Sequence, residues 1–163
     1  MKLGILSDTH IYDRARHLPR AILDTFVKED VDIILHAGDL TSLEILDELK
    51  EISEVKAVQG NMDYFYGTRL PEKEILKINN FKILLFHGYG IYPRGDKAKL
   101  VYKALENGCN VIITGHTHMP LVTELRGVKI INPGSPTTPR YAKPTFAIAE
   151  IEEDIRVKIL EIP

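Results

Sequence analysis

The amino-acid sequence predicts an α/β fold in which two sheets pack together and helices cover their outer sides. In the first half of the chain, short apolar runs alternate with helical patterns, which is typical of βαβ units. The second half consists mostly of strands joined by short turns. With 163 residues, of which 44% are apolar and 27% charged, the chain is long enough to bury the core of one domain over residues 1–163.

Three strands and two helices are predicted in the first half. Apolar residues at helical spacing predict a helix over residues 17–30, with Pro19 tolerated in its first turn. A second helix is expected to open at a capping box formed by Thr41, Ser42, Leu43 and Glu44. The strands are predicted at residues 2–7, 32–37 and 55–58. The middle strand is almost wholly apolar, as expected where both faces of a sheet are covered.

One helix among several strands is predicted in the second half. Asn79 and Asn80 indicate a hairpin turn between two apolar runs. Asp96 caps the start of the helix and Gly108 ends it. The strands are predicted at residues 75–78, 81–86, 111–114, 121–125, 128–131, 145–151 and 155–162.

Composition and charge narrow the class of protein. The formal net charge is −2, from 21 basic and 23 acidic side chains, so no basic excess is present to grip long nucleic acid. Cys109 is the only cysteine, which excludes an intramolecular disulfide and fits a reducing compartment. The N-terminus lacks the apolar length of a signal peptide, and no window approaches the roughly 20 apolar residues that span a bilayer. We therefore expect a cytoplasmic protein with no membrane partner.

Five polar motifs follow predicted strands within one to three residues. They are Asp8-Thr9-His10, Gly38-Asp39, Gly60-Asn61, His87-Gly88 and Gly115-His116-Thr117-His118. Ligands of open α/β sheets bind outside the carboxyl ends of the strands, so these motifs are expected to meet at one rim. They supply seven oxygen and nitrogen donors and no thiolate, a set suited to Mn, Fe, Zn, Ni or Co.

The number of donors points to two metal ions. Seven ligands exceed what one tetrahedral zinc needs, and two ions that share a carboxylate account for the excess. Each motif alone has a simpler explanation, because Asp is favoured in turns after strands and an isolated His is usually a loop residue. A metal site is favoured because all five motifs occur together, in this order along the chain.

These motifs resemble the calcineurin-like metallophosphoesterases, and more closely their small phosphodiesterase branch. The resemblance extends from Asp8 to Arg140 and includes the Asn-Pro-Gly-Ser-Pro stretch at residues 132–136. It implies a four-layer αββα sandwich of two packed mixed sheets flanked by helices. It also implies a dinuclear metal-dependent phosphodiesterase, a hydrolase in which a hydroxide bridging two cations attacks phosphorus in line.

The resemblance also implies roles for individual residues. One metal ion would be held by Asp8, His10, Asp39 and His118. The other would be held by Asp39, Asn61, His87 and His116, so that Asp39 bridges the two. We expect two divalent ions, with Mn²⁺ favoured and Ni²⁺, Fe²⁺, Zn²⁺ or Co²⁺ as alternatives. Catalysis is expected to involve Asp39, Asn61 and His10, and substrate binding to involve Asn61 and Arg140.

Two positions depart from the family pattern. Many relatives carry a His directly after the motif Asn, where it helps to protonate the leaving oxygen, whereas this chain has Met62. Tyr89 stands where several relatives read His-Gly-His. The leaving-group proton must then come from water or another side chain, and slow hydrolysis of alkyl monoesters is expected.

Other polar residues have alternative explanations. His36 lies within a predicted strand and is expected to be a buried structural group, whereas His17 is expected at the surface. Cys109 is expected to pack as a small hydrophobe. Arg140 is expected either to clamp a substrate phosphate or to pair with an acid on the surface.

Three functions are compatible with the sequence. The first is a phosphodiesterase that acts on small phosphodiesters. The second is a two-metal nuclease, which the absence of a basic excess counts against. The third is a non-catalytic scaffold of the same fold, like the retromer subunit that the chain resembles from His87-Gly88 to Gly95-Asp96. The oligomeric state stays open, a homo-oligomer included.

Overall fold

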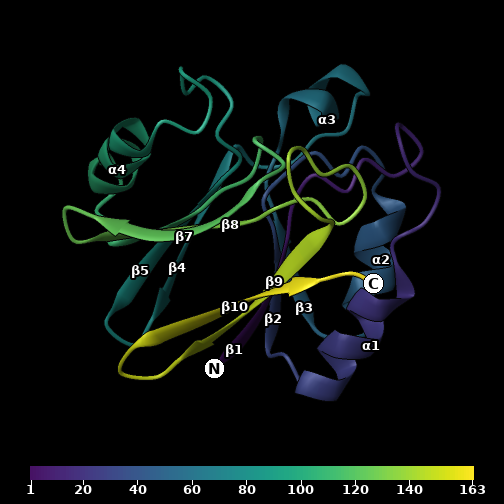
Figure 1. Ribbon diagram of the computed structural model, residues 1–163, viewed down its shortest axis with the longest axis horizontal. Coiled ribbons are helices and arrows are strands. Elements are labelled where there is room, and N and C mark those ends of the chain that lie inside the picture. Colours follow the sequence, from purple (N-terminus) through teal and green to yellow (C-terminus); the bar gives the residue numbers. More distant parts are fainter.

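The computed structural model describes residues 1–163 and consists of two five-stranded sheets packed face to face with helices outside (Figure 1). The strand order is β10-β9-β1-β2-β3 in the first sheet and β4-β5-β6-β8-β7 in the second. Both sheets are mixed, so the predicted sandwich of two packed mixed sheets is confirmed. No helix has the length and apolarity needed to cross a membrane.

The first sheet has a parallel centre. Strands β1 (Lys2–Leu6), β2 (Ile33–His36) and β3 (Glu54–Ala57) run parallel to one another. The hairpin of β9 (Thr145–Ile151) and β10 (Ile155–Glu161) extends this sheet antiparallel to β1. The carboxyl ends of β1, β2 and β3 therefore lie at the same edge.

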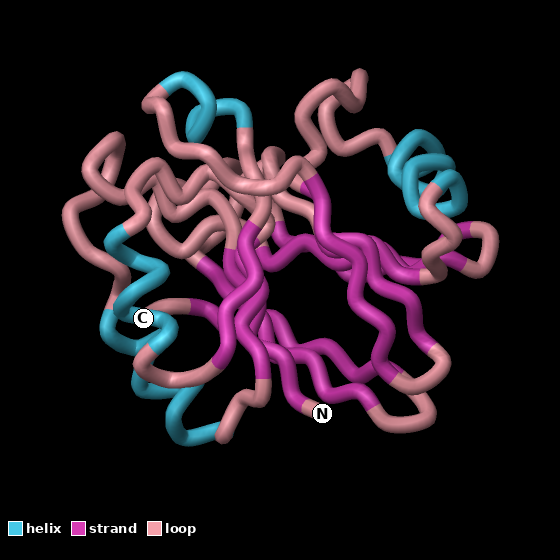
Figure 2. The backbone as a smooth tube through the Cα atoms, turned by 180° about the vertical axis from the view of Figure 1, so that it is seen from behind, coloured by secondary structure: helices cyan, strands magenta, loops and turns pink.

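The second sheet repeats this plan. Its parallel strands are β5 (Phe81–Phe86), β6 (Val111–Ile113) and β8 (Val128–Pro133). Strands β4 (Lys73–Ile78) and β7 (Pro120–Leu125) pair antiparallel with β5 and β8 at the two edges. The loops that follow the parallel strands of both sheets gather at one end of the sandwich (Figure 2).

Three apolar clusters separate the four layers. The largest contains 16 buried residues and fills the space between the sheets, with Leu3 and Ile5 of β1 among them. Helix α1 (Arg20–Glu29) packs Ile22 and Phe26 on the outer face of the first sheet. Helix α4 (Lys97–Glu106) covers the second sheet in the same way. Alternate strand residues thus face different clusters, because successive side chains point to opposite faces of a sheet.

Two short helices complete the fold. Helix α2 (Glu44–Lys50) buries Ile45 and Leu46 beside the first sheet. Helix α3 (Asn61–Phe65) stands above the strand ends and was not predicted. The predicted strands agree with the observed ones to within two residues at each end.

Two local predictions were wrong. Helix α1 begins at Arg20 because Pro19 is extended and occupies the N-cap, so exposed His17 precedes the helix. The predicted capping box is absent: Leu43 is the N-cap residue of α2 and makes no side-chain cap, and it is Ser42 Oγ, not Thr41, that accepts the backbone N–H of Glu44, at 3.3 Å. Thr41 instead donates its hydroxyl proton to Ile11 O, at 2.8 Å. A contact with a distant loop has therefore replaced the local cap.

Candidate metal centre

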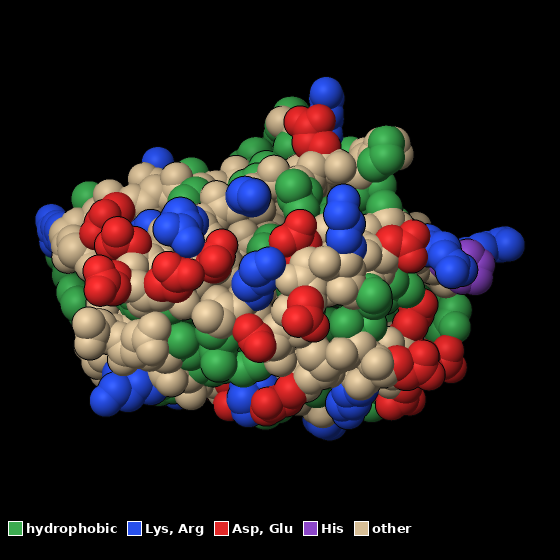
Figure 3. Space-filling view, turned by 90° about the horizontal axis from the view of Figure 1, so that it is seen from below, with side chains coloured by type: hydrophobic (Ala, Val, Ile, Leu, Met, Phe, Trp, Pro, Cys, Tyr) green, Lys and Arg blue, Asp and Glu red, His purple; other side chains and the backbone are tan.

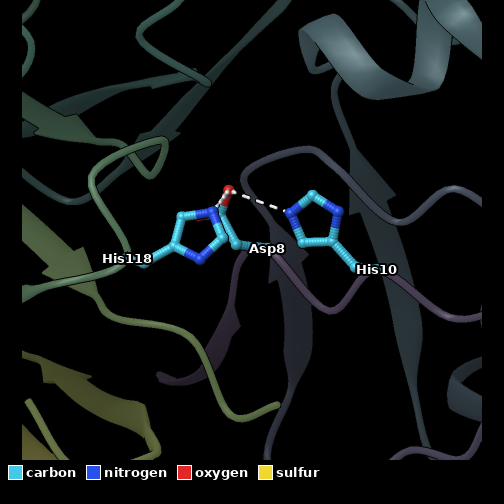
Figure 4. A group of neighbouring side chains, drawn as sticks. All are labelled: Asp8, His10 and His118. Atoms are coloured by element: carbon cyan, nitrogen blue, oxygen red, sulfur yellow. Dashed lines mark ion pairs between the residues drawn. The ribbon is translucent and has the colours of Figure 1, made fainter. Parts of the chain in front are cut away.

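The seven predicted ligands follow five parallel strands, β1, β2, β3, β5 and β6; six lie on loops and Asn61 is the first residue of α3. The structure brings six of them into two groups, in which ligand atoms lie within 4.8 Å of one another: Asp8, His10 and His118; Asp39, His87 and His116. All six side chains are buried. Each group falls within one of the two ligand sets that the family resemblance implies. Figure 4 shows the imidazoles of His10 and His118 on either side of the Asp8 carboxylate.

A left-handed backbone aims these side chains. Five of the seven residues have positive φ angles: Asp8 (55°), His10 (46°), Asp39 (58°), His116 (72°) and His118 (60°). This conformation costs about 1–2 kcal/mol for an ordinary L residue and concentrates at functional sites. It turns the chain sharply after each strand, so Asp8 and His10 face the same point although one residue separates them.

The two carboxylate oxygens of Asp8 have different surroundings: Oδ2 accepts hydrogen bonds from the protein, and Oδ1 faces the histidines of the candidate centre. Oδ2 accepts hydrogen bonds from Ser7 Oγ (2.7 Å) and the backbone N–H of His116 (3.0 Å). Oδ1 lies 3.3 Å from His118 Nε2 and 3.9 Å from His10 Nε2. Burial raises the pKa of this carboxyl, but His118, His87 and Ser7 outweigh burial and hold the pKa well below its usual range.

Asp39 uses its oxygens in the same way. Oδ1 accepts the backbone N–H of Met62 at 2.9 Å. Oδ2 lies 3.3 Å from His87 Nε2 and 3.7 Å from His10 Nε2, so it is close to one imidazole of each group. Burial raises the pKa of Asp39, and the stronger opposing effect of His87 lowers it. The position suits a ligand shared by two ions.

Three imidazoles are held with Nε2 toward the centre. His10 Nδ1 lies 3.0 Å from Asp13 Oδ2, His87 Nδ1 lies 2.7 Å from Ala37 O, and His118 Nδ1 lies 2.6 Å from Thr138 O. Carbonyl and carboxylate oxygens only accept, so each Nδ1 carries the proton and each Nε2 has a free lone pair when the ring is neutral. Metal-binding imidazoles are oriented in this way.

Unpaired buried atoms test whether these residues fit a metal. Five buried side-chain atoms have no hydrogen-bond partner, and four of them belong to predicted ligands: Asp8 Oδ1, His10 Nε2, Asn61 Oδ1 and His87 Nε2. Leaving such a group unpaired costs about 1–3 kcal/mol. Because all four are electron-pair donors, bound cations would satisfy them together. The donor set therefore fits divalent metal ions.

Burial and the neighbouring charged groups shift the pKa values of His10, His87 and His116. Burial lowers the pKa of His87, but Asp39 and Asp8 more than compensate and raise it to about 9. Burial lowers the pKa of His116 to about 4, with His87 and Arg94 adding to the effect. Burial also lowers the pKa of His10. The carboxylates thus draw a proton to His87, and a cation would have to displace it.

Asp63 is a supporting residue that the sequence did not single out. Its buried carboxylate accepts the backbone N–H groups of Asp39 (2.8 Å), Gly60 (2.8 Å) and Thr41 (2.7 Å). The loops after β2 and β3 are thereby tied together beside Asp39 and Asn61. Burial raises the pKa of Asp63, against the effect of these N–H groups. Its place two residues after Asn61 was the only sequence signal.

Glycine is required at two points of close approach. A Cβ at Gly60 would lie 2.1 Å from Asp39 Oδ1, and one at Gly115 would lie 1.9 Å from Ser7 Oγ. Contacts this short would displace Asp39 and the residue next to Asp8. Gly115 therefore lets a loop of the second sheet meet one of the first, and Gly60 lets two neighbouring loops of the first sheet meet.

The stretch 132–136 forms hydrogen bonds to the loops that carry the candidate ligands. Asn132 Nδ2 donates to Gly115 O (3.1 Å) and to Thr117 Oγ1 (3.0 Å), which holds the loop that carries His116 and His118. Ser135 Oγ donates to Asp8 O at 2.7 Å. Asn132 thus acts through the loop and not as a ligand.

The remaining predicted residues lie as follows. His36 is fully buried between Thr9 Oγ1 (3.0 Å) and Gly38 N–H (3.2 Å), and burial lowers its pKa to about 3, so it is a neutral structural group as predicted. Cys109 is buried in the cluster under α4, also as predicted, and burial raises its pKa.

Arg140 is exposed beside the centre, where its backbone N–H donates to His118 O at 3.2 Å. It forms no salt bridge, so the predicted alternative of an acidic partner is not observed.

A paired-sheet sandwich with this donor set at its strand ends is the architecture of a metallophosphoesterase. The chain belongs to the calcineurin-like phosphoesterase superfamily, whose domain model matches residues 1–154. The family predicted from the five motifs is thereby confirmed, and with it the broad class of metal-dependent phosphoesterases.

Individual relatives agree with this family. The chain is 47% identical over 162 residues to a probable metallophosphoesterase from Methanocaldococcus jannaschii, and the match covers 99% of this chain and 82% of that protein. Wild-type Vps29 from Entamoeba histolytica, solved in complex with Zn²⁺, has a TM-score of 0.82 and 29% identity over 99% of both chains. A structure described as a novel archaeal phosphodiesterase has a TM-score of 0.74 and 27% identity, covering 98% of this chain and 100% of that one.

Proposed function

We propose that this protein is a phosphodiesterase that hydrolyses small phosphodiesters with two divalent cations, Mn²⁺ first among them. The observation that carries the proposal is that four predicted ligands each keep a buried donor atom without a hydrogen-bond partner, namely Asp8 Oδ1, His10 Nε2, Asn61 Oδ1 and His87 Nε2. A scaffold has no need to leave these atoms without partners. The similarity to an archaeal phosphodiesterase over nearly the whole chain also supports it.

The two groups of side chains are proposed to hold one cation each. Asp8, His10 and His118 would hold the first, and His87, His116 and Asn61 the second, with Asp39 shared. Bound there, two cations would lower the pKa of a water molecule and neutralise the charge that develops on a phosphoryl group.

The chain's own residues would position the substrate. With its Oδ1 directed to a cation, the Asn61 amide still offers N–H donors to a phosphoryl oxygen. The exposed guanidinium of Arg140 lies on the loop next to His118, where it can pair with a second phosphoryl oxygen. Asp13 fixes the ring of His10, so that this imidazole keeps one orientation during turnover.

The leaving-group proton has no assigned donor among the ligands. Met62 occupies the position after Asn61, and its side chain has no proton to give. Tyr89 is close by: its ring centroid lies 6.1 Å from that of His116. We propose that substrates with good leaving groups are hydrolysed fastest, because they need the least help from an acid.

A scaffold function is the second candidate, and the similarity to Vps29 is the observation that favours it. The two candidates differ in one measurable property, turnover. The complete set of seven donor residues favours the enzyme, since a scaffold does not depend on them.

The decisive experiment measures metal content and hydrolysis on the same sample. We expect purified protein to bind two equivalents of Mn²⁺ and to hydrolyse bis(p-nitrophenyl) phosphate only when metal is present. The Asp39→Asn variant should lose most of the turnover, whereas Asp24→Asn on the exposed side of α1 should not. Protein that binds metal and turns over no phosphodiester in a panel of cyclic nucleotides, diesters and monoesters would favour the scaffold.

A further inference from the structure

A cavity of about 490 Å³ opens beside the candidate metal centre. Asn61 and His87, two of the predicted ligands, form part of its wall. Its size lies within the range of small-molecule sites. Any group attached to a phosphate held at Asn61 and His87 is therefore next to this space.

The walls of the cavity are aromatic and apolar. Tyr64, Tyr89, Phe86 and Leu70 line it, and the two tyrosines are 67% and 58% exposed. Exposed rings of this kind leave apolar surface in water, which favours contact with a flat, apolar ligand. The guanidinium of Arg69 lies 4.8 Å from the centroid of the Tyr64 ring and adds positive charge to the same wall.

Two polar side chains complete the lining. The Gln59 side-chain oxygen accepts the backbone N–H of Leu70 at 2.7 Å, which orients the amide and leaves its NH₂ group as a donor. Glu72 supplies an exposed carboxylate acceptor. An aromatic cavity that offers a donor and an acceptor matches the edge of a nucleobase, since bases present both kinds of group.

The surrounding loops share this character. All seven tyrosines of the chain are at least half exposed; five of them lie in the loops after the parallel strands, and Tyr64 lies in the short helix α3 that follows β3. The same loops carry five of the eight arginines but only one of the thirteen lysines: Arg14, Arg16, Arg69, Arg94 and Arg140. Arginine pairs with phosphate through two parallel hydrogen bonds and stacks on flat rings, which lysine does not do. On the opposite face, acidic and basic side chains are interspersed (Figure 3).

From these observations we propose that the cavity is a nucleobase subsite, so that the substrates are nucleotide phosphodiesters. The base would stack against the tyrosine walls while its phosphate lies at Asn61 and His87. The proposal rests on the function proposed above and names its substrate class. It accounts for aromatic side chains and arginines that metal binding alone does not use.

The test compares two ligands that differ at C1′ of the ribose, where AMP carries adenine and ribose 5-phosphate carries a hydroxyl. AMP and ribose 5-phosphate carry the same sugar phosphate, so the ratio of their dissociation constants isolates the contribution of the base. We expect AMP to bind the Mn²⁺-loaded protein about 5- to 150-fold more tightly in calorimetry, the range for stacking one base. Glu72→Ala should lower this ratio, because an acceptor for the adenine amino group is removed.

Two exposed tyrosines give a matched pair of variants. Tyr64→Ala removes a wall of the cavity, whereas Tyr102→Ala removes a ring on α4 that also lies beside an arginine, Arg126, at 5.7 Å. Tyr64→Ala should bring the ratio close to one, and Tyr102→Ala should leave it unchanged.

Equal affinity of the wild-type protein for the two ligands, or no binding of AMP, would overturn the subsite. A similar loss of the ratio in both tyrosine variants would overturn it as well. Since calorimetry reports binding, a protein that prefers AMP but hydrolyses no diester would contradict the proposed function and leave the subsite standing.

Discussion

Replacing Asp63 by Asn tests whether a buried carboxylate holds the centre in place. Asp63 accepts three backbone N–H groups, two of them at Oδ2 and one at Oδ1. Asparagine has one oxygen, so its NH₂ group must face at least one of these donors. The N–H groups of Asp39 and Gly60 are buried, and a buried donor left unpaired costs about 1–3 kcal/mol.

We therefore expect Asp63→Asn to lower the free energy of unfolding by about 1–3 kcal/mol. Metal affinity should fall by about 10- to 100-fold, the usual effect of losing a group that positions a ligand. Urea denaturation of the metal-free protein and calorimetric titration with Mn²⁺ measure the two effects separately.

Asp24→Asn is the matched control for this experiment. The side chain of Asp24 is 67% exposed on α1, where it lies 3.7 Å from Arg20, so its loss should change stability by less than about 0.5 kcal/mol. If Asp63→Asn resembled this control in both measurements, the carboxylate would have no role in placing Asp39, and the reasoning would be refuted.

Three further outcomes are expected. Asp39→Asn should reduce turnover and metal content more than His118→Gln does, because Asp39 Oδ2 lies near one imidazole of each group whereas His118 belongs to the first group alone; equal losses would contradict a shared ligand. Met62→His should raise the hydrolysis of alkyl esters relative to nitrophenyl esters, as acid catalysis contributes about 10²–10⁴ in rate; a shallow dependence on leaving group in the wild type would mean that an acid is already present. Burial lowers the pKa of His36 to about 3 in the folded protein, whereas the unfolded chain takes up this proton below pH ~6.5. The free energy of unfolding should therefore fall by up to about 1.4 kcal/mol for each pH unit below pH ~6.5. His36→Gln should flatten this dependence in urea titrations, and an unchanged slope would exclude His36 as its source.

Strand positions and the meeting of the candidate ligands could be predicted because each rests on a local signal. An apolar run marks a strand such as β2, and a polar motif directly after it marks the strand end. Since parallel strands end at a common edge, the order of motifs along the chain was enough to predict that Asp8, Asp39 and His116 meet.

The groups that orient the candidate ligands could not be predicted, because they lie on segments that are distant along the chain. The carbonyl groups that orient His87 and His118 belong to Ala37 and Thr138, 50 and 20 residues away along the chain. No side-chain pattern records where a backbone carbonyl will lie. Thr41 shows the same limit: its sequence context is typical of a helix cap, yet its N–H is bound by Asp63.

The centre belongs to both sheets, and this makes the packing between them part of the site. Asp8, His10 and Asp39 follow strands of the first sheet, whereas His87, His116 and His118 follow strands of the second. Each group of ligands contains residues from both. A small shift of one sheet against the other would therefore separate donors that are proposed to bind the same ion.

Two neighbouring leucines on β5 allow this dependence to be measured. Leu84 and Leu85 are both fully buried, but Leu84 faces the cluster under α4 and Leu85 faces the cluster between the sheets. Replacing either by Ala should lower the free energy of unfolding by about 2–5 kcal/mol. We expect only Leu85→Ala to weaken Mn²⁺ binding in calorimetry, because its cavity lies between the two sheets that carry the centre. Equal weakening by both variants would show that metal affinity follows general stability and that the sheets do not act as separate supports.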